Sequence, residues 1–341
     1  MLGALLKETE LQKDYLGNEG VETIYFGGGT PSLLQIEDLK SQVDTVRQNF
    51  TVLPEAEITL EANPDDINEE RLTGWKEIGI NRLSIGVQSF FEEDLLWMNR
   101  AHNAEQAISS LQLAVKYFDN ITMDLIYGHP LLSNEKWKQN VEKVITLNIP
   151  HISCYALTVE PKTPLSKLIK EKKKEDIQQE KQAEQFLLLM EWLENAGYEH
   201  YEISNFAKPG FRSRHNSSYW QGKKYLGLGP SAHSFNGESR QWNISNNNTY
   251  IESLEKDEIP FEKEILTQSQ KTNEYIMTSL RTMEGLDINK IPEAMSHELK
   301  SASKKFIDSG KLTLKENKLL LTREGKLFAD GIAADLFIDA V

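Results

Sequence analysis

The sequence predicts an α/β protein in which parallel strands are covered by helices, followed by a smaller α+β module. Three observations support this fold class. Strand-like and helix-like segments alternate over residues 1–203, most strands end in a polar residue or a glycine, and the apolar pattern over 271–341 changes to helices around one hairpin. Such alternation is typical of either an open doubly wound sheet or a βα barrel, and the pattern alone leaves both open.

The predicted elements follow one another along a first domain, 1–203. Leucines at roughly helical spacing predict a helix over 4–16, which no predicted strand precedes. Runs of β-branched and aromatic residues predict strands at 22–26, 57–61, 82–87, 120–127, 151–157 and 198–203. Amphipathic segments between them predict helices at 35–49, 68–78, 103–118, 134–147 and 178–196.

The first strand runs directly into three consecutive glycines, Gly27–Gly29, followed by Thr30 and Pro31. Without Cβ atoms, the backbone amides of such a loop can approach a ligand closely, and φ is free to become positive. An ordinary tight turn between strand and helix is the other explanation. Because glycine motifs often arise by chance, the loop alone does not decide between the two.

Polar side chains at the ends of later strands favour the ligand-binding explanation. Glu61 ends one predicted strand, Gln88 ends the next, and Asp124 interrupts the one after that. In βα barrels the carboxyl ends of the strands form the ligand-binding face. We therefore expect the glycine loop, two carboxylates and an amide to converge at one edge.

A second segment, 204–270, has a different composition. Over 204–243 the apolar periodicity fades while Asn, Ser, Gly and aromatic residues increase, so we predict an irregular segment whose aromatic residues argue against disorder. His215 lies next to Tyr219 and Trp220, which can form the wall of a site for a flat ligand. For His233 we favour a simpler role as a hydrogen-bonded loop histidine.

The last predicted domain, 271–341, is a small winged-helix-like module. Its apolar spacing indicates a helix, a hairpin around Lys315–Asn317 and a final helix from Thr322 to about Leu336. Such modules often bind DNA. This one carries 11 basic and 11 acidic residues, so it lacks the expected basic surface, and we interpret it as a packing or partner-binding module.

Composition excludes several classes of function. The net charge of −14 argues against nucleic acid or an anionic membrane as the main partner. No apolar run is long enough to span a membrane, and we expect a cytoplasmic protein. The single cysteine, Cys154, rules out a disulfide framework and a cysteine-based metal site made by this chain alone.

Seven short motifs together resemble one family. The sequence is similar to the oxygen-independent coproporphyrinogen III oxidase-like group of radical S-adenosylmethionine proteins, and within it to the subgroup of heme chaperones. The matching motifs span most of the chain: Gly27–Pro31, Glu61–Pro64, Gly86–Phe90, Asn99–His102, Asp124–Gly128, Ser204–Ala207 and Gly227–Ala232.

The resemblance implies a partial (β/α)6-type barrel with S-adenosylmethionine across the carboxyl ends of its strands. Carboxylates suit the ribose diol and the α-amino group of this cofactor, and an arginine suits its carboxylate. The implied cofactor-binding residues, among which the sequence identifies no catalytic group, are Gly28, Gly29, Thr30, Glu61, Gln88, Arg100, Asp124 and Ala156.

The subgroup assignment depends on the motif His215–Trp220, which has the pattern His-Asn-x-x-Tyr-Trp. By the resemblance, this element is linked to heme binding and is absent from the oxidases. Imidazole is a good axial ligand for iron, and aromatic rings pack on a porphyrin face. The implied heme-binding residues are His215, as the iron ligand, with Asn216, Tyr219 and Trp220.

One feature departs from the family pattern. The family holds a 4Fe-4S cluster through three cysteines that follow the first barrel strand, and this sequence has no such loop. Cys154 cannot replace them because it is alone in a later strand. We therefore expect the chain to be an N-terminally shortened form, a barrel without its first strand, rather than a relative that functions without a cluster.

Three functions follow as hypotheses. The leading one is a heme chaperone that transfers heme to an unidentified acceptor protein, on a scaffold that binds S-adenosylmethionine and, in the complete protein, the cluster. The first alternative is an oxygen-independent coproporphyrinogen III oxidase. The second is a cluster-free protein that binds S-adenosylmethionine or a nucleoside. The sequence leaves open whether the protein is an enzyme.

Overall fold

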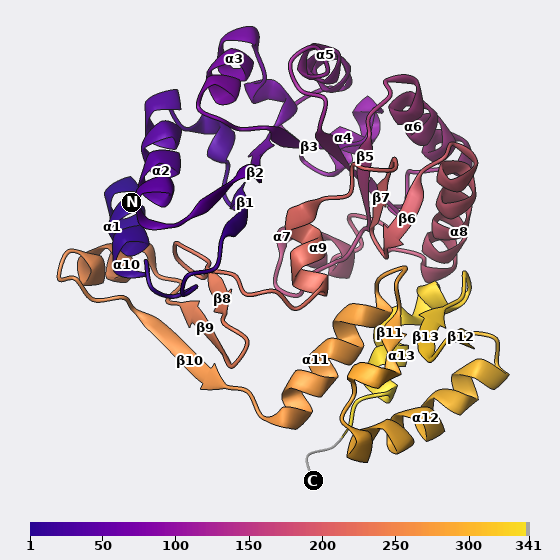
Figure 1. Ribbon diagram of the computed structural model, residues 1–341. Coiled ribbons are helices and arrows are strands. Elements are labelled where there is room, and N and C mark those ends of the chain that lie inside the picture. The colour runs from indigo at the N-terminus through magenta and orange to yellow at the C-terminus, as the bar shows by residue number, and fades with distance from the viewer. Residues whose placement is uncertain (339–341) are drawn as a thin grey trace. The chain divides into compact units, whose positions relative to one another are not determined.

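The computed structural model describes residues 1–338 (Figure 1). The chain forms two compact units. Unit 1 comprises Met1–Tyr25, Leu34–Ile58 and the chain from Ser213 onward. Unit 2 comprises Phe26–Leu33 and Thr59–Arg212. The domain boundaries predicted near residues 203 and 270 stay predictions.

A mainly parallel sheet forms the centre of unit 2. The end of β2 (Val52–Ala62) pairs in parallel with β3, β3 with β4, and β4 with β5. A short strand, β7, is antiparallel to both β5 and β6. With β1 (Val21–Phe26) beside β2, the order is β1-β2-β3-β4-β5-β7-β6. The remaining strands are β3 (Arg82–Gln88), β4 (Ile121–Tyr127), β5 (His151–Ala156), β6 (Glu199–Glu202) and β7 (Asn205–Ala207).

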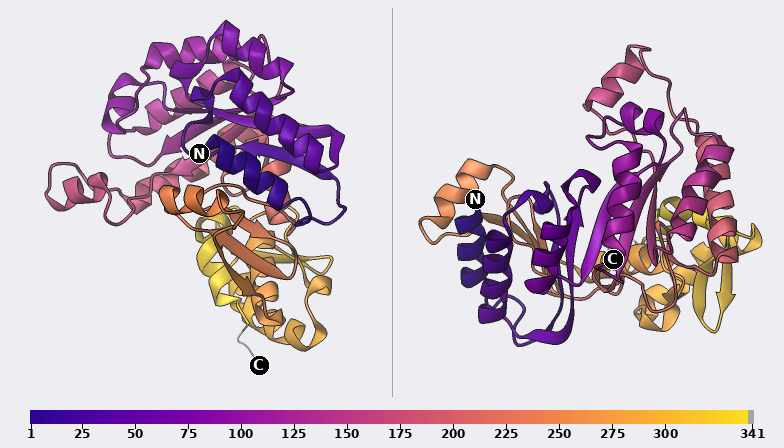
Figure 2. Two further views of the ribbon diagram at one scale, coloured as in Figure 1. Left: turned by 90° about the vertical axis from the view of Figure 1, so that its left-hand side faces the viewer. Right: turned by 90° about the horizontal axis from the view of Figure 1, so that it is seen from above.

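The six predicted strands are confirmed, and β7 was not predicted because three residues are too few to show a period. Helices connect the strands of unit 2, and the predicted ones are present with small changes at their ends. The short helix α4 was not predicted, and Figure 2 shows α7, another short helix, standing away from the sheet. The helices are α3 (Glu69–Glu77), α4 (Glu92–Trp97), α5 (Ala104–Ala114), α6 (Asn134–Thr146), α7 (Pro164–Lys170) and α8 (Gln179–Asn195).

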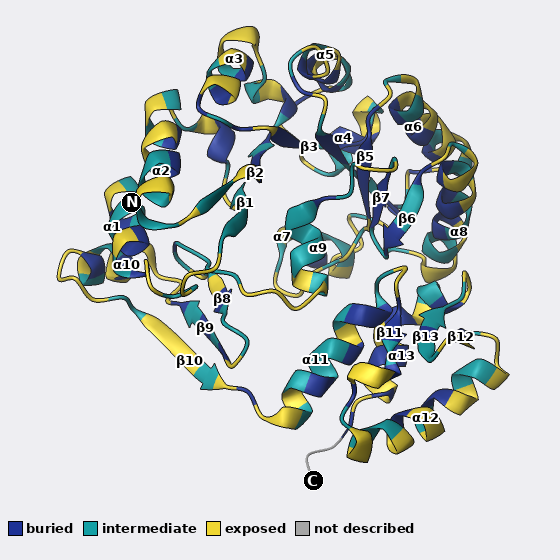
Figure 3. Cartoon of the chain, in the orientation of Figure 1, coloured by how far each residue is buried: buried dark blue, intermediate teal, exposed yellow. Residues whose placement is uncertain are grey.

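Each central strand has one apolar and one polar face. Successive side chains of a strand point to opposite faces, so Leu83, Ile85 and Val87 share one side of β3, and all three are fully buried. Trp75 and Trp137, from α3 and α6, are also fully buried. In Figure 3 the strands β3 and β5 are mainly dark blue, the colour of buried residues. The opposite face of β3 carries Arg82, Ser84, Gly86 and Gln88.

Unit 1 contains the first two helices and the segment from Ser213. Helix α1 (Leu2–Leu11) is shorter than predicted, and α2 (Ile36–Asn49) is as predicted. The segment 204–270, predicted to be irregular, contains several short helices and strands joined by loops. They begin at polar caps such as Ser213 and Asn246 instead of showing an apolar repeat. In unit 1 they are α9 (Arg214–Trp220), β8 (His233–Phe235), β9 (Ser239–Asn243), α10 (Asn247–Leu254) and β10 (Phe261–Ile265), the three strands forming an antiparallel sheet.

The C-terminal module has its own apolar core. Ile276, Leu299, Leu319 and Ile332 are all buried within one cluster. The predicted hairpin is present between β12 and β13, where Glu316 and Asn317 adopt positive φ. This arrangement of helices and a two-stranded wing confirms the predicted winged-helix-like form. Its elements are α11 (Gln268–Leu280), β11 (Leu286–Asp287), α12 (Glu293–Asp308), β12 (Leu312–Lys315), β13 (Lys318–Leu321) and α13 (Ala329–Asp335).

A buried carboxylate ties the N-terminal helix to the rest of unit 1. Glu8 accepts hydrogen bonds from Gly229 N at 2.8 Å, Asn243 Nδ2 at 2.6 Å and Tyr250 Oη at 2.5 Å. Burial raises the pKa of Glu8, and the three hydrogen bonds oppose that rise. Among the described residues, no helix is long and apolar enough to cross a membrane.

Replacing Glu8 by alanine should leave three buried donors without their acceptor. We expect the free energy of unfolding to fall by about 1–3 kcal/mol in Glu8→Ala, as measured by urea unfolding. The matched control is Glu10→Ala, an exposed carboxylate in the same helix. Equal losses in the two variants would show that the hydrogen bonds to Glu8 contribute little.

Candidate functional site

The glycine loop lies in unit 2, directly after β1. Gly28 and Gly29 have φ values of +77° and +65°, and a Cβ built on either would meet nothing within 4 Å. The requirement for glycine at these two positions is therefore conformational. The peptide N–H of Gly28 donates to Glu61 Oε2 at 3.1 Å. The structure thus joins two of the predicted site residues, one from the loop and one from the end of β2.

The register of the sheet brings other predicted residues together. Glu61 lies opposite Ser84, Gly86 lies opposite Asp124, and Asp124 lies opposite Ser153 on the next strand. These residues occupy the polar face of the sheet. Ala156 does not join them, because strand alternation places its side chain on the opposite face of β5 from Ser153. Only its main chain can serve a ligand on the polar face.

Gln88 and Arg100 meet above Gly86. The register shifts between Gly86 and Gln88, where Gln88 has a φ of +65°. A Cβ at Gly86 would lie 3.2 Å from Gln88 Nε2 and 3.4 Å from Arg100 Nη2, so glycine leaves room for both side chains. Arg100 Nη2 donates to Gly86 O and to Asn63 Oδ1, each at 3.2 Å.

These two side chains keep hydrogen-bonding capacity that the described protein does not use. Gln88 Oε1 and Arg100 Nε are both buried without a hydrogen-bond partner. Leaving a buried polar atom unpaired costs about 1–3 kcal/mol, so each such atom requires an explanation. A bound polar ligand that pairs with both atoms is such an explanation.

Burial shifts the pKa values of Asp124 and Arg100 at this edge of the sheet. Burial raises the pKa of Asp124 to about 7, while a hydrogen bond with Ser153 lowers it and the carboxylate of Glu61 raises it further. Burial lowers the pKa of Arg100, against the opposing attraction of Asp65 and Asp124. Near neutral pH, Asp124 can therefore either accept or donate a hydrogen bond.

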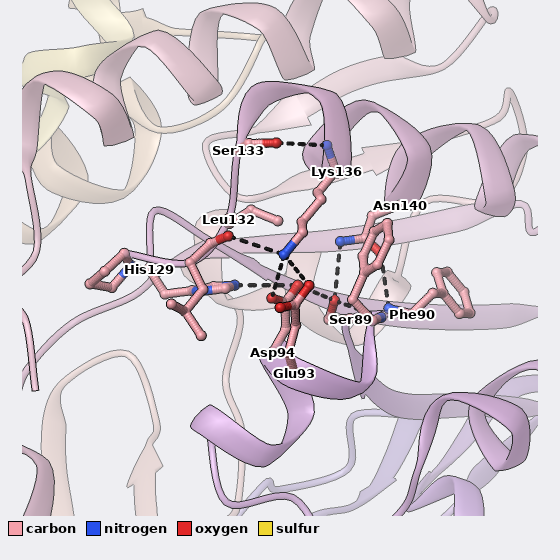
Figure 4. Close-up of polar contacts among 12 residues, drawn as sticks. Ser89, Phe90, Glu93, Asp94, His129, Leu132, Ser133, Lys136 and Asn140 are labelled. Atoms are coloured by element: carbon pink, nitrogen blue, oxygen red, sulfur yellow. Dashed lines mark hydrogen bonds and ion pairs between the residues drawn. The ribbon is translucent and has the colours of Figure 1, made fainter.

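A buried network holds the loop that follows Gln88 (Figure 4). Ser89 Oγ donates to Asp94 Oδ2 at 2.7 Å, and Asn140 Nδ2 donates to Ser89 Oγ at 3.2 Å. Asn140 Oδ1 accepts from the peptide N–H of Phe90 at 2.9 Å. Sequence reasoning missed Asp94 and Asn140, because they come from α4 and α6, remote from the strand end that they support.

His129 lies at the back of this network. Its Nε2 is 3.6 Å from Asp94 Oδ2, and its ring stacks on Trp97 with a centroid distance of 5.6 Å. Both His129 and Asp94 are fully buried. Within the described part of the chain, however, no group of three or more His, Cys, Asp or Glu side chains is placed to hold a metal ion. We therefore interpret the cluster as support for the β3 end.

The predicted heme motif forms α9 in unit 1. The helix begins where Glu57, on β2, accepts hydrogen bonds from the peptide N–H groups of His215 at 3.0 Å and Arg214 at 3.2 Å. Ser213 Oγ accepts from Asn216 N at 3.2 Å. Glu57 was not predicted as part of this site, because only the tertiary fold brings β2 to the start of α9.

His215 is held on three sides. Its ring stacks on Tyr25 with a centroid distance of 4.6 Å and an interplanar angle of 17°. Its Nδ1 is 3.0 Å from Thr23 Oγ1, and its Nε2 is 3.2 Å from Tyr219 Oη. Burial lowers the pKa of His215 to about 4, although Glu57 opposes the shift, so the imidazole is neutral at pH 7.

The other motif residues differ in their surroundings. Tyr219 is 38% exposed, and its ring meets the ring of His215 edge to face. Tyr225 packs against the ring of Tyr219, with a centroid distance of 4.7 Å. The guanidinium of Arg281 lies 5.2 Å from the ring centroid of Trp220, whose Nε1 is buried without a partner. Asn216 contributes its peptide N–H to the cap. His233 belongs to β8 and tilts against Trp242 at 6.2 Å, apart from the motif.

Comparisons with known proteins show which family the chain resembles. The model of the Radical SAM superfamily matches residues 6–159, and that of the HemN C-terminal domain matches residues 266–328. The chain is 32% identical to "Heme chaperone HemW" of Bacillus subtilis over 93% of this chain and 85% of that protein. It is 33% identical to the protein of the same name from Mycobacterium tuberculosis, over 98% of this chain and 85% of that protein.

The chain belongs to the HemW family. The fold is shown independently by coproporphyrinogen III oxidase (HemN) from Escherichia coli, described as a radical SAM enzyme, with a TM-score of 0.83. That match is 22% identical and covers 98% of this chain and 82% of the other. It confirms the predicted partial barrel with its C-terminal module. The resemblance to radical S-adenosylmethionine proteins is likewise confirmed.

Membership of this superfamily implies S-adenosylmethionine and a 4Fe-4S cluster, and the residues fit these two groups differently. Buried, unpartnered atoms of Gln88 and Arg100 beside Glu61 and Asp124 suit a polar cofactor. The cluster does not fit, because thiolates are its usual ligands and Cys154 is the one cysteine of the chain, 2% exposed within β5.

The protonation of Asp124 should make stability depend on pH. The pKa of this carboxyl is about 7 in the folded protein and 3.8 in a model peptide, so the folded state binds more protons between these values. The free energy of unfolding therefore falls as pH rises through this range. Asp124→Asn should flatten that part of the profile, measured by urea unfolding at several pH values. The exposed Asp119→Asn is the control, and an equally steep profile in Asp124→Asn would contradict the assignment.

Proposed function

We propose that this protein is a heme chaperone that binds heme at the α9 segment and transfers it to an acceptor protein. The main support for this function is the neutral imidazole of His215, which lies between Tyr25 and Tyr219. It is carried by a helix whose first peptide N–H groups donate to Glu57. The names of the HemW relatives support the same function. A cytoplasmic location is part of this proposal.

The residues around α9 suit a flat, anionic ligand. Tyr219 and Trp220 offer aromatic surface for the porphyrin, and neutral imidazole is a good ligand for iron. The cations Arg214 and Lys223 flank the helix and pair with Glu22 at 3.7 and 2.8 Å. Since such exposed pairs contribute little stability, they can be exchanged for the carboxylates of heme propionates at little cost.

Unit 2 supplies a second binding site in this proposal, for S-adenosylmethionine. The glycine loop with Thr30 would approach the cofactor through its backbone, and Arg100 would pair with the cofactor carboxylate. Glu61 and Asp124 would accept from its hydroxyl or amino groups. When bound, this cofactor supplies a sulfonium and a reactive 5′ carbon. The residues of this chain bind and orient it.

Heme binding should depend on His215. Purified wild-type protein, titrated with ferric protoporphyrin IX, should form a saturable one-to-one complex and pass its heme to apomyoglobin, a generic acceptor. His215→Ala should weaken heme binding by about 10- to 100-fold. His233→Ala, which alters the exposed histidine of β8, should leave affinity unchanged. Equal affinities in all three proteins would remove the main support for the chaperone function.

Binding of S-adenosylmethionine should depend on Arg100. Titration calorimetry of the iron-free chain should detect binding in the wild type and a loss of about 1.5–3 kcal/mol in Arg100→Ala, since a charged hydrogen bond is removed. Lys116→Ala, an exposed cation, is the control. The absence of any binding would contradict this part of the proposal.

The lone, buried cysteine supports a second candidate, a cluster-free protein that binds S-adenosylmethionine or a nucleoside. It shares the site in unit 2 and does not require heme. Binding of S-adenosylmethionine by a protein that fails to bind heme would favour this candidate. The other alternative, an oxygen-independent coproporphyrinogen III oxidase, would require the formation of protoporphyrinogen.

A further inference from the structure

A long connection, residues 157–178, joins β5 to α8 in unit 2, and we call it the strap. It leaves the sheet at the carboxyl end of β5, the edge that carries the candidate cofactor site. Connections longer than about 12–15 residues are uncommon in compact domains, and ordered ones are usually functional. The middle of the strap forms α7, which stands away from the sheet (Figure 2). Lys162 and Lys172, at the bends on either side of α7, have positive φ values of +68° and +58°.

One residue holds the middle of the strap to the rest of unit 2. The ammonium group of Lys174 donates to the main-chain oxygen of Trp97 at 2.5 Å. It also lies 4.4 Å from the ring centroid of Trp97. Every other hydrogen bond of the described residues 159–176 is made within that segment. Lys174 is therefore the anchor of the strap.

The anchor lies at the end of α4, where a cation is favourable. The last carbonyl groups of a helix have no partner within the helix, and they form the negative end of its dipole. Trp97 is the last residue of α4, so the ammonium group of Lys174 caps this end. A cation over the face of an indole ring adds a further attraction. The two contacts together fix the strap to α4.

The same helix lies between Gln88 and Arg100, the two cofactor-site residues that have unpaired buried atoms. The start of α4 is joined to the residue after Gln88, because Ser89 Oγ donates to Asp94 Oδ2 at 2.7 Å (Figure 4). The end of α4 is joined to Arg100, whose peptide N–H donates to Leu95 O at 2.9 Å. A bond of this kind closes the end of a helix, so the main chain of Arg100 follows any movement of α4.

His129 connects the two ends of α4. Asp94 and Trp97 are one helical turn apart, and both contact its ring. His129 Nε2 is 3.6 Å from Asp94 Oδ2, and the ring stacks on Trp97 with a centroid distance of 5.6 Å and an interplanar angle of 24°. His129 and Asp94 are fully buried. Because a packed interior transmits displacements, movement of Trp97 would disturb the contacts that also hold Asp94.

We propose that the strap positions α4, and through it Arg100 and Gln88, for the binding of S-adenosylmethionine, with Lys174 as the positioning residue. The inference rests on the proposed cofactor site in unit 2. Lys174 acts through Trp97, and the side chains that touch the cofactor remain Arg100 and Gln88. Docking of the strap and binding of the cofactor are then linked, so each strengthens the other by the same factor.

The first test measures the affinity of the full, iron-free chain for S-adenosylmethionine by titration calorimetry. Lys174→Met removes the cation but keeps an unbranched side chain, and it should bind about 3- to 20-fold more weakly than the wild type. Lys173→Met changes the adjacent lysine, whose side chain is 66% exposed, and should bind as the wild type does. Urea unfolding should give the same midpoint for both variants, which separates positioning from a loss of fold.

A double variant tests whether Lys174 acts through Arg100. Substitutions that act through one group are not additive. In protein that already carries Arg100→Ala, the further change Lys174→Met should weaken binding by less than about twofold. Full additivity would show that Lys174 contributes independently of Arg100, for example by touching the cofactor, and would overturn the proposal.

Tryptic cleavage of the strap gives a readout that a general loss of stability would not imitate. Exposed lysines at positions 167, 170, 172 and 173 offer cleavage sites within the strap. Saturating S-adenosylmethionine should slow cleavage of the wild type at these sites by about the factor that Lys174→Met loses in affinity. Without cofactor, Lys174→Met should be cut faster than the wild type, and cofactor should protect it less. Mass spectrometry of the fragments identifies the sites.

The outcomes separate this inference from the proposed function. If the wild type does not bind S-adenosylmethionine, the proposed cofactor site fails and the inference fails with it. If the wild type binds but Lys174→Met has the same affinity, the cofactor site stands and the positioning role of the strap is overturned. Weaker binding by Lys174→Met without any protection of the strap in the wild type would contradict the linkage, and it would overturn the inference as well.

Discussion

The separation of an apolar from a polar face on each strand is the constraint on which the rest of the structure depends. A shift of one residue in register would move Leu83, Ile85 and Val87 from one side of β3 to the other. It would also remove Gly86 from its position opposite Asp124. The same register therefore maintains the apolar core and aligns the polar side chains that form the candidate cofactor site.

The two candidate sites use buried polar groups in different ways. In unit 2, atoms of Gln88 and Arg100 are left unpaired, as expected for a site whose remaining hydrogen bonds come from a ligand. In unit 1, the ring nitrogens of His215 are both occupied. A ligand that binds the imidazole of His215 must therefore displace Thr23 or Tyr219 from one of its two ring nitrogens.

Much of the fold was predictable from the sequence, because long strands and helices show clear periods. The six strands, the main helices and the C-terminal hairpin were all found where predicted. Short elements such as β7, α4 and α9 were not, since a few residues cannot show a period. Of the predicted cofactor residues, Ala156 lies with its side chain on the face away from the site. Side chains alternate along β5, so Ser153 and Tyr155 share the polar face and Ala156 points to the other one.

The sequence by itself determined the family, the glycine loop, the polar strand ends and the motif His215–Trp220, because these are local patterns of residue type. Only the tertiary structure decided which distant groups support them. Glu57 and Thr23 contact His215 of α9, from which they are separated by 158 and 192 residues of sequence. Asn140 accepts a hydrogen bond from the peptide N–H of Phe90, 50 residues away in sequence. Such contacts depend on how strands and helices pack, and no local pattern in the chain encodes them.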